Sequence, residues 1–450
     1  MASARGEFSS RFGFVMAAAG SAVGLGNIWG FPTQAASNGG AAFLLVYLFL
    51  AFTLAYPALM AELIIGRHAH ANAVSALRLI SPTPLLRHIG ATTGVIGLIV
   101  ASLILSFYAI VAGWMIAFCL SSLSHPLGMT EESDWLTSFG LPRNIFFMLA
   151  FMALTVGIIS EGVREGIERW SERLMPVLLV TLVLLVLYVL TLDGAMEGLK
   201  VYLLPDVERA LSPQLIISAL GAAFFSLSLG VGTMLIYGSY INDDENLPVV
   251  GSLVTLVDIS IAVIAGFLVL PAMYVALHNG VEIFTDTGEL ISEHTLIFTV
   301  LPELFNTMGT TGTVISFTFF ALMSIAALTS SISMLEVPVA YTIEEHGVGR
   351  KKAVFVIGGL IALVSTVILM NFSGLFGLVV AFTTRYSQPL LGFMFCVYAG
   401  WIWHRDQLLQ EVRKGSPKVE HTLFWSIWPW YVRFVCPVII LAIFAQSILG

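Results

Sequence analysis

Two short segments combine glycine and serine inside otherwise apolar stretches, and segments of this kind can bind small ions. The first is AAAGSAVGLGNIWGFP at residues 17–32, and the second is FFSLSLGVGTM at residues 224–234. Glycine and proline both weaken an α-helix, so neither segment is expected to form a continuous helix. An interrupted helix leaves backbone N–H and carbonyl groups free to act as ligands.

The surroundings of these freed groups decide their chemistry. Lipid cannot satisfy them, so a break inside a membrane must border a polar cavity. Carbonyl oxygens suit a small hard cation, and the positive N-terminal ends of half-helices suit a carboxylate. The alternative is that the glycines only let helices approach closely, and for either segment alone both explanations stay open.

The composition indicates that the bilayer is the main solvent of this chain. Of its 450 residues, 58% are hydrophobic and only 11% are charged. Such values are typical of membrane proteins, and apolar runs of about 20 residues, enough to cross a bilayer, recur throughout. The net charge is −8 and the basic residues are scattered, so a lipid bilayer rather than a nucleic acid is the expected partner.

We predict an all-α integral membrane protein with eleven transmembrane helices in a single transporter domain over residues 1–450. The expected spans are 12–36, 41–66, 89–121, 143–159, 172–192, 213–240, 249–279, 312–343, 351–371, 373–401 and 421–449. The broken spans 1 and 6 lie five spans apart, as in a 5+5 inverted repeat that places a site between the breaks. Repeat one is expected at about 12–192, repeat two at about 213–401, and one extra C-terminal helix at about 421–449.

The distribution of Lys and Arg predicts the orientation, because positive charges stay on the cytoplasmic side of short loops. With the N-terminus inside, most basic residues fall on the cytoplasmic side, and only Arg143, Lys200 and Arg209 fall on the other. We therefore expect a multi-pass protein of the cell inner (plasma) membrane, with its N-terminus in the cytoplasm and its C-terminus outside. The first span is expected to be retained rather than cleaved.

Four motifs resemble the neurotransmitter:sodium symporter family, especially its bacterial sodium-dependent amino-acid transporters. They are GSAVGLGNIWGFP in span 1, Tyr108 with Trp114 in span 3, AFFSLSLGVG in span 6 and AALTSSISMLE in span 8. The resemblance covers essentially the whole chain. It implies a secondary active symporter that couples sodium to uptake of a small-molecule amino-acid substrate by alternating access.

The resemblance also implies two sodium sites. The first would use the carbonyl of Ala22, the side chains of Asn27, Ser226 and Asp258, and the carboxylate of the substrate. The second would use the carbonyls of Gly20, Val23 and Ala326 and the hydroxyls of Thr329 and Ser330. Both sets consist of neutral or anionic oxygens, which a hard cation requires. The alternative for the two hydroxyls is bonding to carbonyls of their own helix.

For the substrate, the resemblance implies a pocket between the two breaks. Its residues would be Ser21, Ala22, Gly24, Gly26, Ile104, Tyr108, Phe225, Ser226, Ser228, Val231, Ser330 and Met334. Amine carriers of this family have an aspartate at the position of Gly24, so the glycine implies a substrate that keeps its own carboxylate. The apolar residues of this set favour a neutral, hydrophobic amino acid.

Asp258 is an ionisable residue inside a predicted span, which is costly unless a cation lies nearby. Chloride-dependent relatives have an asparagine here, and a glutamine where this chain has Ala222. We expect Asp258 to supply the negative charge itself, so that transport uses two sodium ions and requires no chloride. The alternative is an aspartate that is paired only for structure.

The gates depart from the family pattern on one side. Most relatives close the outer side with an ion pair, but this chain has Gly30 in place of the arginine, and no Asp or Glu between Asn371 and Thr384. Without this ion pair, Tyr108 and Phe225 are expected to contribute more to closing the outer side of the substrate site.

On the inner side, Arg5 and Glu344, with Tyr240 beside them, resemble the cytoplasmic gate of the family. Gly166 and Pro176 bracket the start of span 5. Because proline removes a helix hydrogen bond and glycine is a poor helix former, this stretch is expected to unwind locally.

Three other kinds of protein were weighed against a symporter. A sodium-dependent amino-acid sensor would bind without transport, and it stays the main alternative. A carrier for a nucleobase or betaine from another inverted-repeat family is disfavoured by Gly24 and Tyr108. An enzyme is not expected, because the sequence shows no cluster of zinc ligands, no aspartyl pair and no activated serine.

Overall fold

The computed structural model describes residues 6–124, 127–204, 210, 212–283, 290 and 296–449, and almost all of their regular structure is helical. The helices of the first half are α1 (Arg11–Ala22), η1 (Gly26–Gly30), α2 (Phe31–Ser37), α3 (Ala41–Leu50), η2 (Ala51–Ala55), α4 (Tyr56–Ala69), α5 (Ala73–Leu79), α6 (Pro84–Ser124), α7 (Thr130–Thr137), α8 (Leu141–Ser160), η4 (Val163–Glu168), α9 (Arg169–Val189) and α10 (Ala195–Leu203).

Those of the second half are α12 (Pro213–Ser226), α13 (Thr233–Gly238), α14 (Leu247–His278), η5 (Leu296–Val300), α16 (Leu301–Thr307), α17 (Gly309–His346), α18 (Arg350–Met370), α19 (Phe372–Val380), η6 (Ala381–Ser387), α20 (Gln388–Val397), η7 (Tyr398–Ile402), α21 (Arg405–Arg413), η8 (Val419–His421), α22 (Leu423–Trp430), η9 (Tyr431–Val435) and α23 (Cys436–Leu449).

The prediction of an all-helical membrane protein with a broken first span is confirmed. Within the described residues, eight helices are long and apolar enough to cross a membrane, and a ninth is added if α1 and α2 count as one bent span. Predicted span 6 is divided into α12 and α13, and predicted span 10 comprises α19, η6, α20 and η7. Residues 213–240 are therefore interrupted, whereas residues 373–401 form one uninterrupted run in which α-helix alternates with π-helix.

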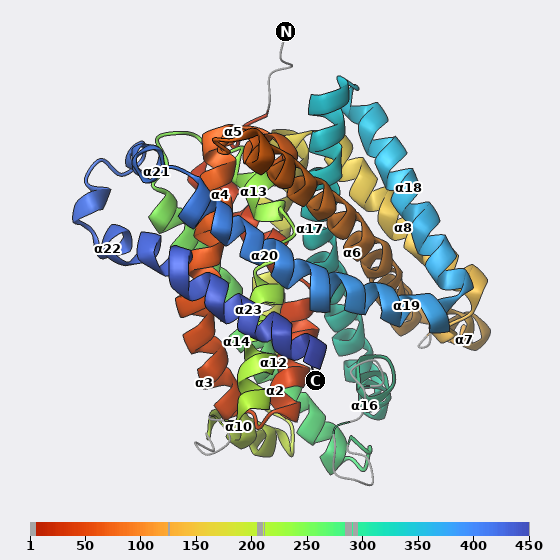
Figure 1. Ribbon diagram of the computed structural model, residues 1–450. Helices are drawn as coiled ribbons and strands as arrows, with labels where there is room; N and C mark the ends of the chain where they lie inside the picture. The colour runs from red at the N-terminus through yellow and green to blue at the C-terminus, as the bar shows by residue number, and fades with distance from the viewer. Residues whose placement is uncertain are drawn as a thin grey trace.

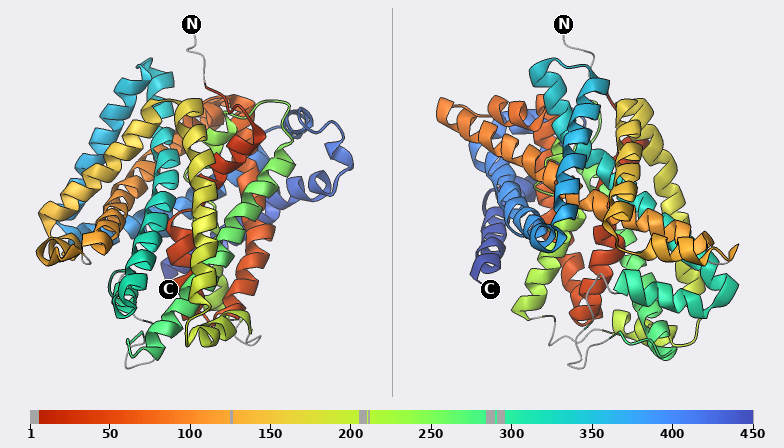
Figure 2. Two further views of the ribbon diagram at one scale, coloured as in Figure 1. Left: turned by 180° about the vertical axis from the view of Figure 1, so that it is seen from behind. Right: turned by 90° about the vertical axis from the view of Figure 1, so that its right-hand side faces the viewer.

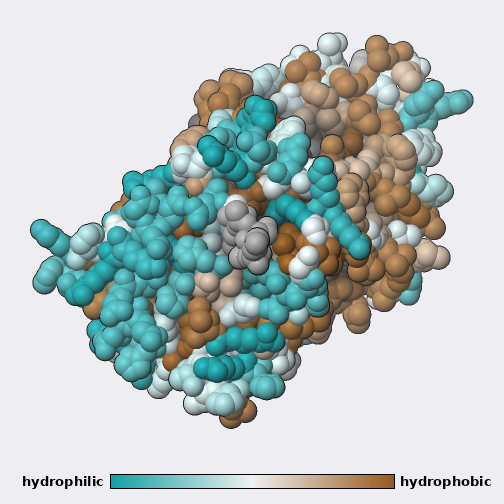
Figure 3. Space-filling view, turned by 90° about the horizontal axis from the view of Figure 1, so that it is seen from above, coloured by the Kyte–Doolittle hydropathy of each residue, from teal (hydrophilic) through white to brown (hydrophobic). Residues whose placement is uncertain are grey.

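The two broken spans lie in the middle of the helix bundle. α1 packs against α9, α14 and α17, while α12 packs against α3 and α13 against α4. In Figure 1, α13 lies above α12, and α6 crosses the bundle obliquely. The C-terminal helices (blue) lie on an outer face in the side view of Figure 2. Figure 3 shows hydrophilic residues gathered over the end that carries α5 and α21, with hydrophobic residues along the flank.

Backbone conformation ends the helices at both breaks. At the first break, Val23 is extended, and the chain turns by 58° between α1 and the following helix. At the second, Ser228, Gly230 and Gly232 all have positive φ, at 51°, 76° and 81°. Left-handed residues cannot continue a right-handed helix, and glycine adopts this conformation without steric cost. The glycines noted in the sequence therefore cause the second break directly.

A buried ion pair fastens α21 to the end of α4. Arg67 Nε donates to Glu411 Oε1 at 2.8 Å, and both side chains are almost wholly buried. His68 Nδ1 lies 3.1 Å and Lys414 Nζ 3.0 Å from Glu411 Oε2. Burial alone would raise the pKa of Glu411, but the His68 hydrogen bond, the charge of Arg67 and Lys414 together lower this pKa to about 2.

We expect the Arg67–Glu411 ion pair to make the free energy of unfolding depend on pH at acidic pH. The pKa of Glu411 is lower in the folded protein than the value of about 4.3 in an unfolded chain, so its stabilisation is complete above pH 4.3. It is lost as the pH falls toward 2. Glu411→Gln should cost about 3 kcal/mol at neutral pH, because Arg67 stays buried with its charge uncompensated.

Thermal unfolding of purified protein between pH 2 and pH 6 measures both effects. Asp406→Asn changes an exposed carboxylate of the same helix and serves as the matched control. Equal melting temperatures and equal acid dependence in the two variants would contradict the assignment to Glu411.

Candidate functional site

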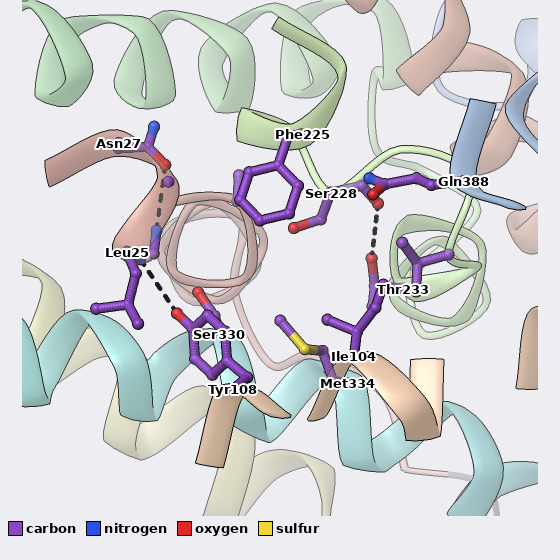
Figure 4. A pocket seen from close by; sticks show the side chains of 14 residues that line it. Leu25, Asn27, Ile104, Tyr108, Phe225, Ser228, Thr233, Ser330, Met334 and Gln388 are labelled. Atoms are coloured by element: carbon purple, nitrogen blue, oxygen red, sulfur yellow. Dashed lines mark hydrogen bonds between the residues drawn. The ribbon is translucent and has the colours of Figure 1, made fainter. Parts of the chain in front are cut away.

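A cavity lies between the two breaks. It is lined by Ala22, Gly24, Leu25, Gly26, Asn27, Ile104, Tyr108, Phe225, Ser228, Val231, Thr233, Ser330, Met334 and Gln388 (Figure 4). Every residue predicted for the substrate lines it except Ser21 and Ser226. Leu25, Thr233 and Gln388 were missed, although a threonine after the glycine run and a glutamine within an apolar span were visible signals.

One side of the cavity carries hydrogen-bonding groups suited to a carboxylate. The Leu25 backbone N–H, freed at the break, donates to Tyr108 Oη at 3.1 Å. A Cβ placed on Gly24 would lie 2.7 Å from both Tyr108 Oη and Ser330 Oγ, which is too close for any side chain. A Cβ on Gly26 would lie 2.7 Å from the Phe225 ring. The two glycines therefore let the backbone itself line the cavity.

Asn27, Ser226 and Asp258 form one buried cluster beside this side of the cavity. Asn27 Nδ2 donates to Asp258 Oδ1 at 2.7 Å and to Ser226 Oγ at 2.8 Å, and Ser226 Oγ donates to Asp258 Oδ2 at 2.7 Å. Tyr47 Oη donates to Ser226 Oγ at 3.2 Å. All three side chains predicted for the first cation are thus within hydrogen-bond distance of one another. They supply a carboxylate, an amide and a hydroxyl, which are ligands for a hard cation.

The residues predicted for the second cation meet where α17 contacts the end of α1. Ser330 Oγ on α17 donates to the carbonyl oxygens of Val23 at 3.0 Å and Gly20 at 3.3 Å. Thr329 Oγ1 donates to Ala326 O at 3.1 Å within its own helix, which is the alternative considered for these hydroxyls. A Cβ on Gly20 would lie 3.1 Å from Thr329 Cβ, so the two helices are in direct contact. The residues predicted for the second cation therefore lie close together, and Ser330 is the one whose hydroxyl bonds to the carbonyls of the first break.

The two breaks are also bonded to each other and to α4. Ser228 Oγ donates to Ser21 O at 3.0 Å, and Ser21 Oγ donates to Ser333 Oγ on α17 at 2.7 Å. The freed Gly230 N–H donates to the buried carboxylate of Glu62 at 2.7 Å. Glu62 therefore satisfies part of the unwound backbone, as a break inside a membrane requires.

An aromatic cluster lies beside the cavity, next to the part of α6 that follows Tyr108 in the chain. Phe298 of η5 is at its centre and is 7% exposed. Its ring centroid lies 5.1 Å from that of Phe118, 5.5 Å from that of Trp114 and 6.1 Å from that of Trp29. Phe139 lies 5.8 Å from it. Sequence analysis missed this cluster, because its members come from four separate segments.

On the other side of the cavity, polar contacts join the turn after α13 to α17 and α18. Tyr240 Oη donates to Glu336 Oε1 at 2.7 Å, and Arg350 Nη2 lies 2.6 Å from Glu336 Oε2. Glu344 accepts from the Asn72 backbone N–H at 2.7 Å. Arg5, predicted as the partner of Glu344, lies outside the described residues. Glu336 and Arg350 are the contacts of this region that sequence analysis did not identify.

Glu168 holds the start of α1 against η4 on the same side. The Ser9 backbone N–H donates to both carboxylate oxygens, at 3.0 and 2.9 Å, and Ser10 N–H donates to Oε1 at 3.2 Å. η4 is a π-helix in which a Cβ on Gly166 would lie 2.1 Å from Ile158 O, and Pro176 lies inside α9. Residues 166–168 thus belong to this π-helix and residues 169–176 to α9, and the expected local unwinding between Gly166 and Pro176 stays a prediction.

We expect Glu168→Gln to loosen this end of α1. A hydrogen bond to a charged group contributes about 1.5–3 kcal/mol, so amide exchange at Ser9 and Ser10 should accelerate about 10- to 100-fold. Hydrogen-exchange mass spectrometry on residues 6–14 measures the effect. Glu165→Gln is the control, because Glu165 belongs to the same η4 but is 64% exposed and pairs with Arg169. Equal exchange in both variants would show that Glu168 does not fasten the segment.

Comparison with known proteins gives consistent matches over the whole chain. The sequence profile of the sodium:neurotransmitter symporter family matches residues 5–144 and 136–450. A sodium-dependent transporter of Bacillus subtilis, YhdH, is 35% identical over 98% of this chain and 97% of its own length. One from Haemophilus influenzae is 32% identical over 99% and 98%. The crystal structure of MhsT in complex with L-phenylalanine matches with a TM-score of 0.85 and 33% identity, over 98% of this chain and 100% of MhsT.

Proposed function

Because the chain belongs to the sodium:neurotransmitter symporter family, we propose that it takes up a neutral, hydrophobic amino acid together with two sodium ions, by alternating access and without chloride. The family consists of transporters, so the chain is not an enzyme. The observation that carries the proposal is the cavity between the two helix breaks, with the Asn27, Ser226 and Asp258 cluster beside it. This arrangement would allow a sodium ion bound at the cluster to contact the carboxylate of a substrate in the cavity.

Coupling follows from that contact. The substrate carboxylate would accept hydrogen bonds from the Leu25 N–H and Tyr108 Oη and would lie next to the first sodium ion. Neither charge is well compensated alone inside the bilayer, since a lone ion at low dielectric is costly. Each therefore raises the affinity for the other, and this reciprocity makes sodium drive amino-acid binding. The second sodium ion would bind at Gly20, Val23 and Ser330.

The apolar part of the cavity favours a hydrophobic side chain. Ile104, Phe225, Val231 and Met334 line it together, and no charged residue is among the described lining residues. MhsT, which this chain resembles over its full length, was crystallised with L-phenylalanine. We therefore propose that the amino acid is neutral and that burial of its side chain contributes to affinity.

Alternating access needs a closure on each side of the cavity. We propose that Phe298 and its aromatic neighbours close the outer side in place of the missing ion pair. On the inner side, the Glu168 contacts and the Tyr240, Glu336 and Arg350 network would close the path. We propose that the N-terminus lies in the cytoplasm and the C-terminus outside the plasma membrane, an orientation that the distribution of basic residues supports.

Uptake into proteoliposomes tests the proposal. Radiolabelled amino acids should accumulate when sodium is outside and should not accumulate when choline replaces it. Replacement of chloride by gluconate should leave uptake unchanged. Sodium-dependent binding without accumulation would support the sensor alternative, and binding that ignores sodium would contradict both.

A further inference from the structure

Gln388 is a buried polar side chain of the cavity without an assigned role. It begins α20 and is 3% exposed. Its Oε1 has no hydrogen-bond partner among the residues that the structure describes. Buried polar atoms are nearly always hydrogen-bonded, to protein, water or ligand, so an unpaired acceptor facing a ligand cavity indicates that the ligand supplies a donor.

The position of Gln388 shows which part of a substrate it would meet. In Figure 4 its amide points into the cavity on the side opposite Tyr108 and Leu25, where the carboxylate is proposed to bind. Apolar side chains, among them Phe225 and Met334, lie between the two sides. A substrate held by its carboxylate would therefore extend an apolar segment across the cavity and bring its far end to Gln388.

The backbone fixes Gln388 relative to the second break. A Cβ on Gly230 would lie 2.1 Å from the Gln388 carbonyl oxygen, so the unwound segment packs directly on the first turn of α20. Gly230 has a φ of 76° and its N–H is held by Glu62. Thr233 Oγ1, next to the amide of Gln388, donates to Ser228 O at 3.2 Å and can still accept a hydrogen bond. The side of the cavity opposite Tyr108 thus carries two hydrogen-bond acceptors, Gln388 Oε1 and Thr233 Oγ1.

Resting on the proposed function, we propose that Gln388 is a specificity-determining residue. It selects aromatic amino acids that carry a hydrogen-bond donor at the far end of the side chain, a phenol or an indole, over wholly apolar ones. Phe225 and Met334 suit an aromatic ring in the middle of the cavity, since rings pack favourably on rings and on sulfur. The described lining residues include no acid to compensate a basic side chain, which disfavours lysine and arginine.

Competition binding in sodium with the purified full chain tests this selectivity. Tyrosine, tryptophan, phenylalanine and leucine compete against one radiolabelled amino acid. In the wild type, tyrosine and tryptophan should bind about tenfold more tightly than phenylalanine, as one neutral hydrogen bond to a buried acceptor provides. In Gln388→Met, which keeps the side-chain length but removes the acceptor, this preference should vanish. Gln407→Met alters an exposed glutamine of α21 and should keep the preference.

Two results would overturn the inference while leaving the proposed function intact. One is wild-type protein that binds phenylalanine or leucine as tightly as tyrosine in sodium. The other is a tyrosine preference that persists in Gln388→Met. If Gln388→Met does not fold, the order of affinities of the four amino acids for the wild type tests the inference by itself. Absence of any sodium-dependent amino-acid binding would instead overturn the proposed function, and with it the role of Gln388.

Discussion

Gly24→Ala should abolish amino-acid uptake. The added methyl group would lie 2.7 Å from both Ser330 Oγ and Tyr108 Oη, closer than folded proteins tolerate, so both groups must move. Tyr108 is proposed to bind the substrate carboxylate, and Ser330 contacts the carbonyls of the first break. Displacing a positioning group by about 1 Å costs on the order of 100-fold, and we expect at least that loss in uptake. Initial rates in proteoliposomes measure it.

The same span provides a matched control. Within the described residues, a Cβ on Gly30 would meet no atom within 4 Å, and neither Gly24 nor Gly30 has a positive φ. Gly30→Ala should therefore transport within about threefold of the wild type, because it adds the same methyl group without a contact or backbone strain. Melting temperatures of both variants distinguish lost binding from lost fold. Uptake by Gly24→Ala close to that of the control would show that this glycine does not shape the site.

Asp258→Asn should raise the sodium concentration required for half-maximal uptake about 100-fold. The two carboxylate oxygens accept from Asn27 and Ser226, and Asp258 is completely buried. An asparagine keeps the size but removes the charge and one acceptor. A charged hydrogen bond contributes about 1.5–3 kcal/mol, and 2.8 kcal/mol corresponds to 100-fold in affinity. Sodium titrations of uptake in chloride-free buffer measure the shift.

Chloride provides a second readout for the same variant. If Asp258 supplies the negative charge beside the first sodium ion, added chloride should restore part of the uptake of Asp258→Asn and should not affect the wild type. Asp134→Asn changes an exposed carboxylate of α7 and should leave both titrations unchanged. An unchanged sodium requirement in Asp258→Asn would refute its role as a sodium ligand. A chloride requirement in the wild type would refute chloride-independent transport.

The sequence alone predicted the helical membrane fold and the positions of both breaks. It could do so because these features depend on local composition. Closely spaced glycines such as Gly230 and Gly232 disfavour a helix, and an apolar run of about 20 residues is long enough to span the bilayer. The resemblance to the neurotransmitter:sodium symporter family also implied which side chains would meet, and Asn27, Ser226 and Asp258 do form one cluster. Their roles as sodium ligands stay a prediction.

Only the tertiary structure revealed Phe298 among the tryptophans, Glu168 under the start of α1, and Gln388 in the cavity. Nothing in the sequence around these three residues distinguishes them, because each contacts a residue of its site that is more than 150 positions away in the chain. Helix packing brings them into contact, and no local periodicity records which distant helix a side chain will face. Local sequence therefore determines the backbone breaks. Helix packing determines the contacts of Phe298 and Glu168, which we propose close the cavity, and the position of Gln388.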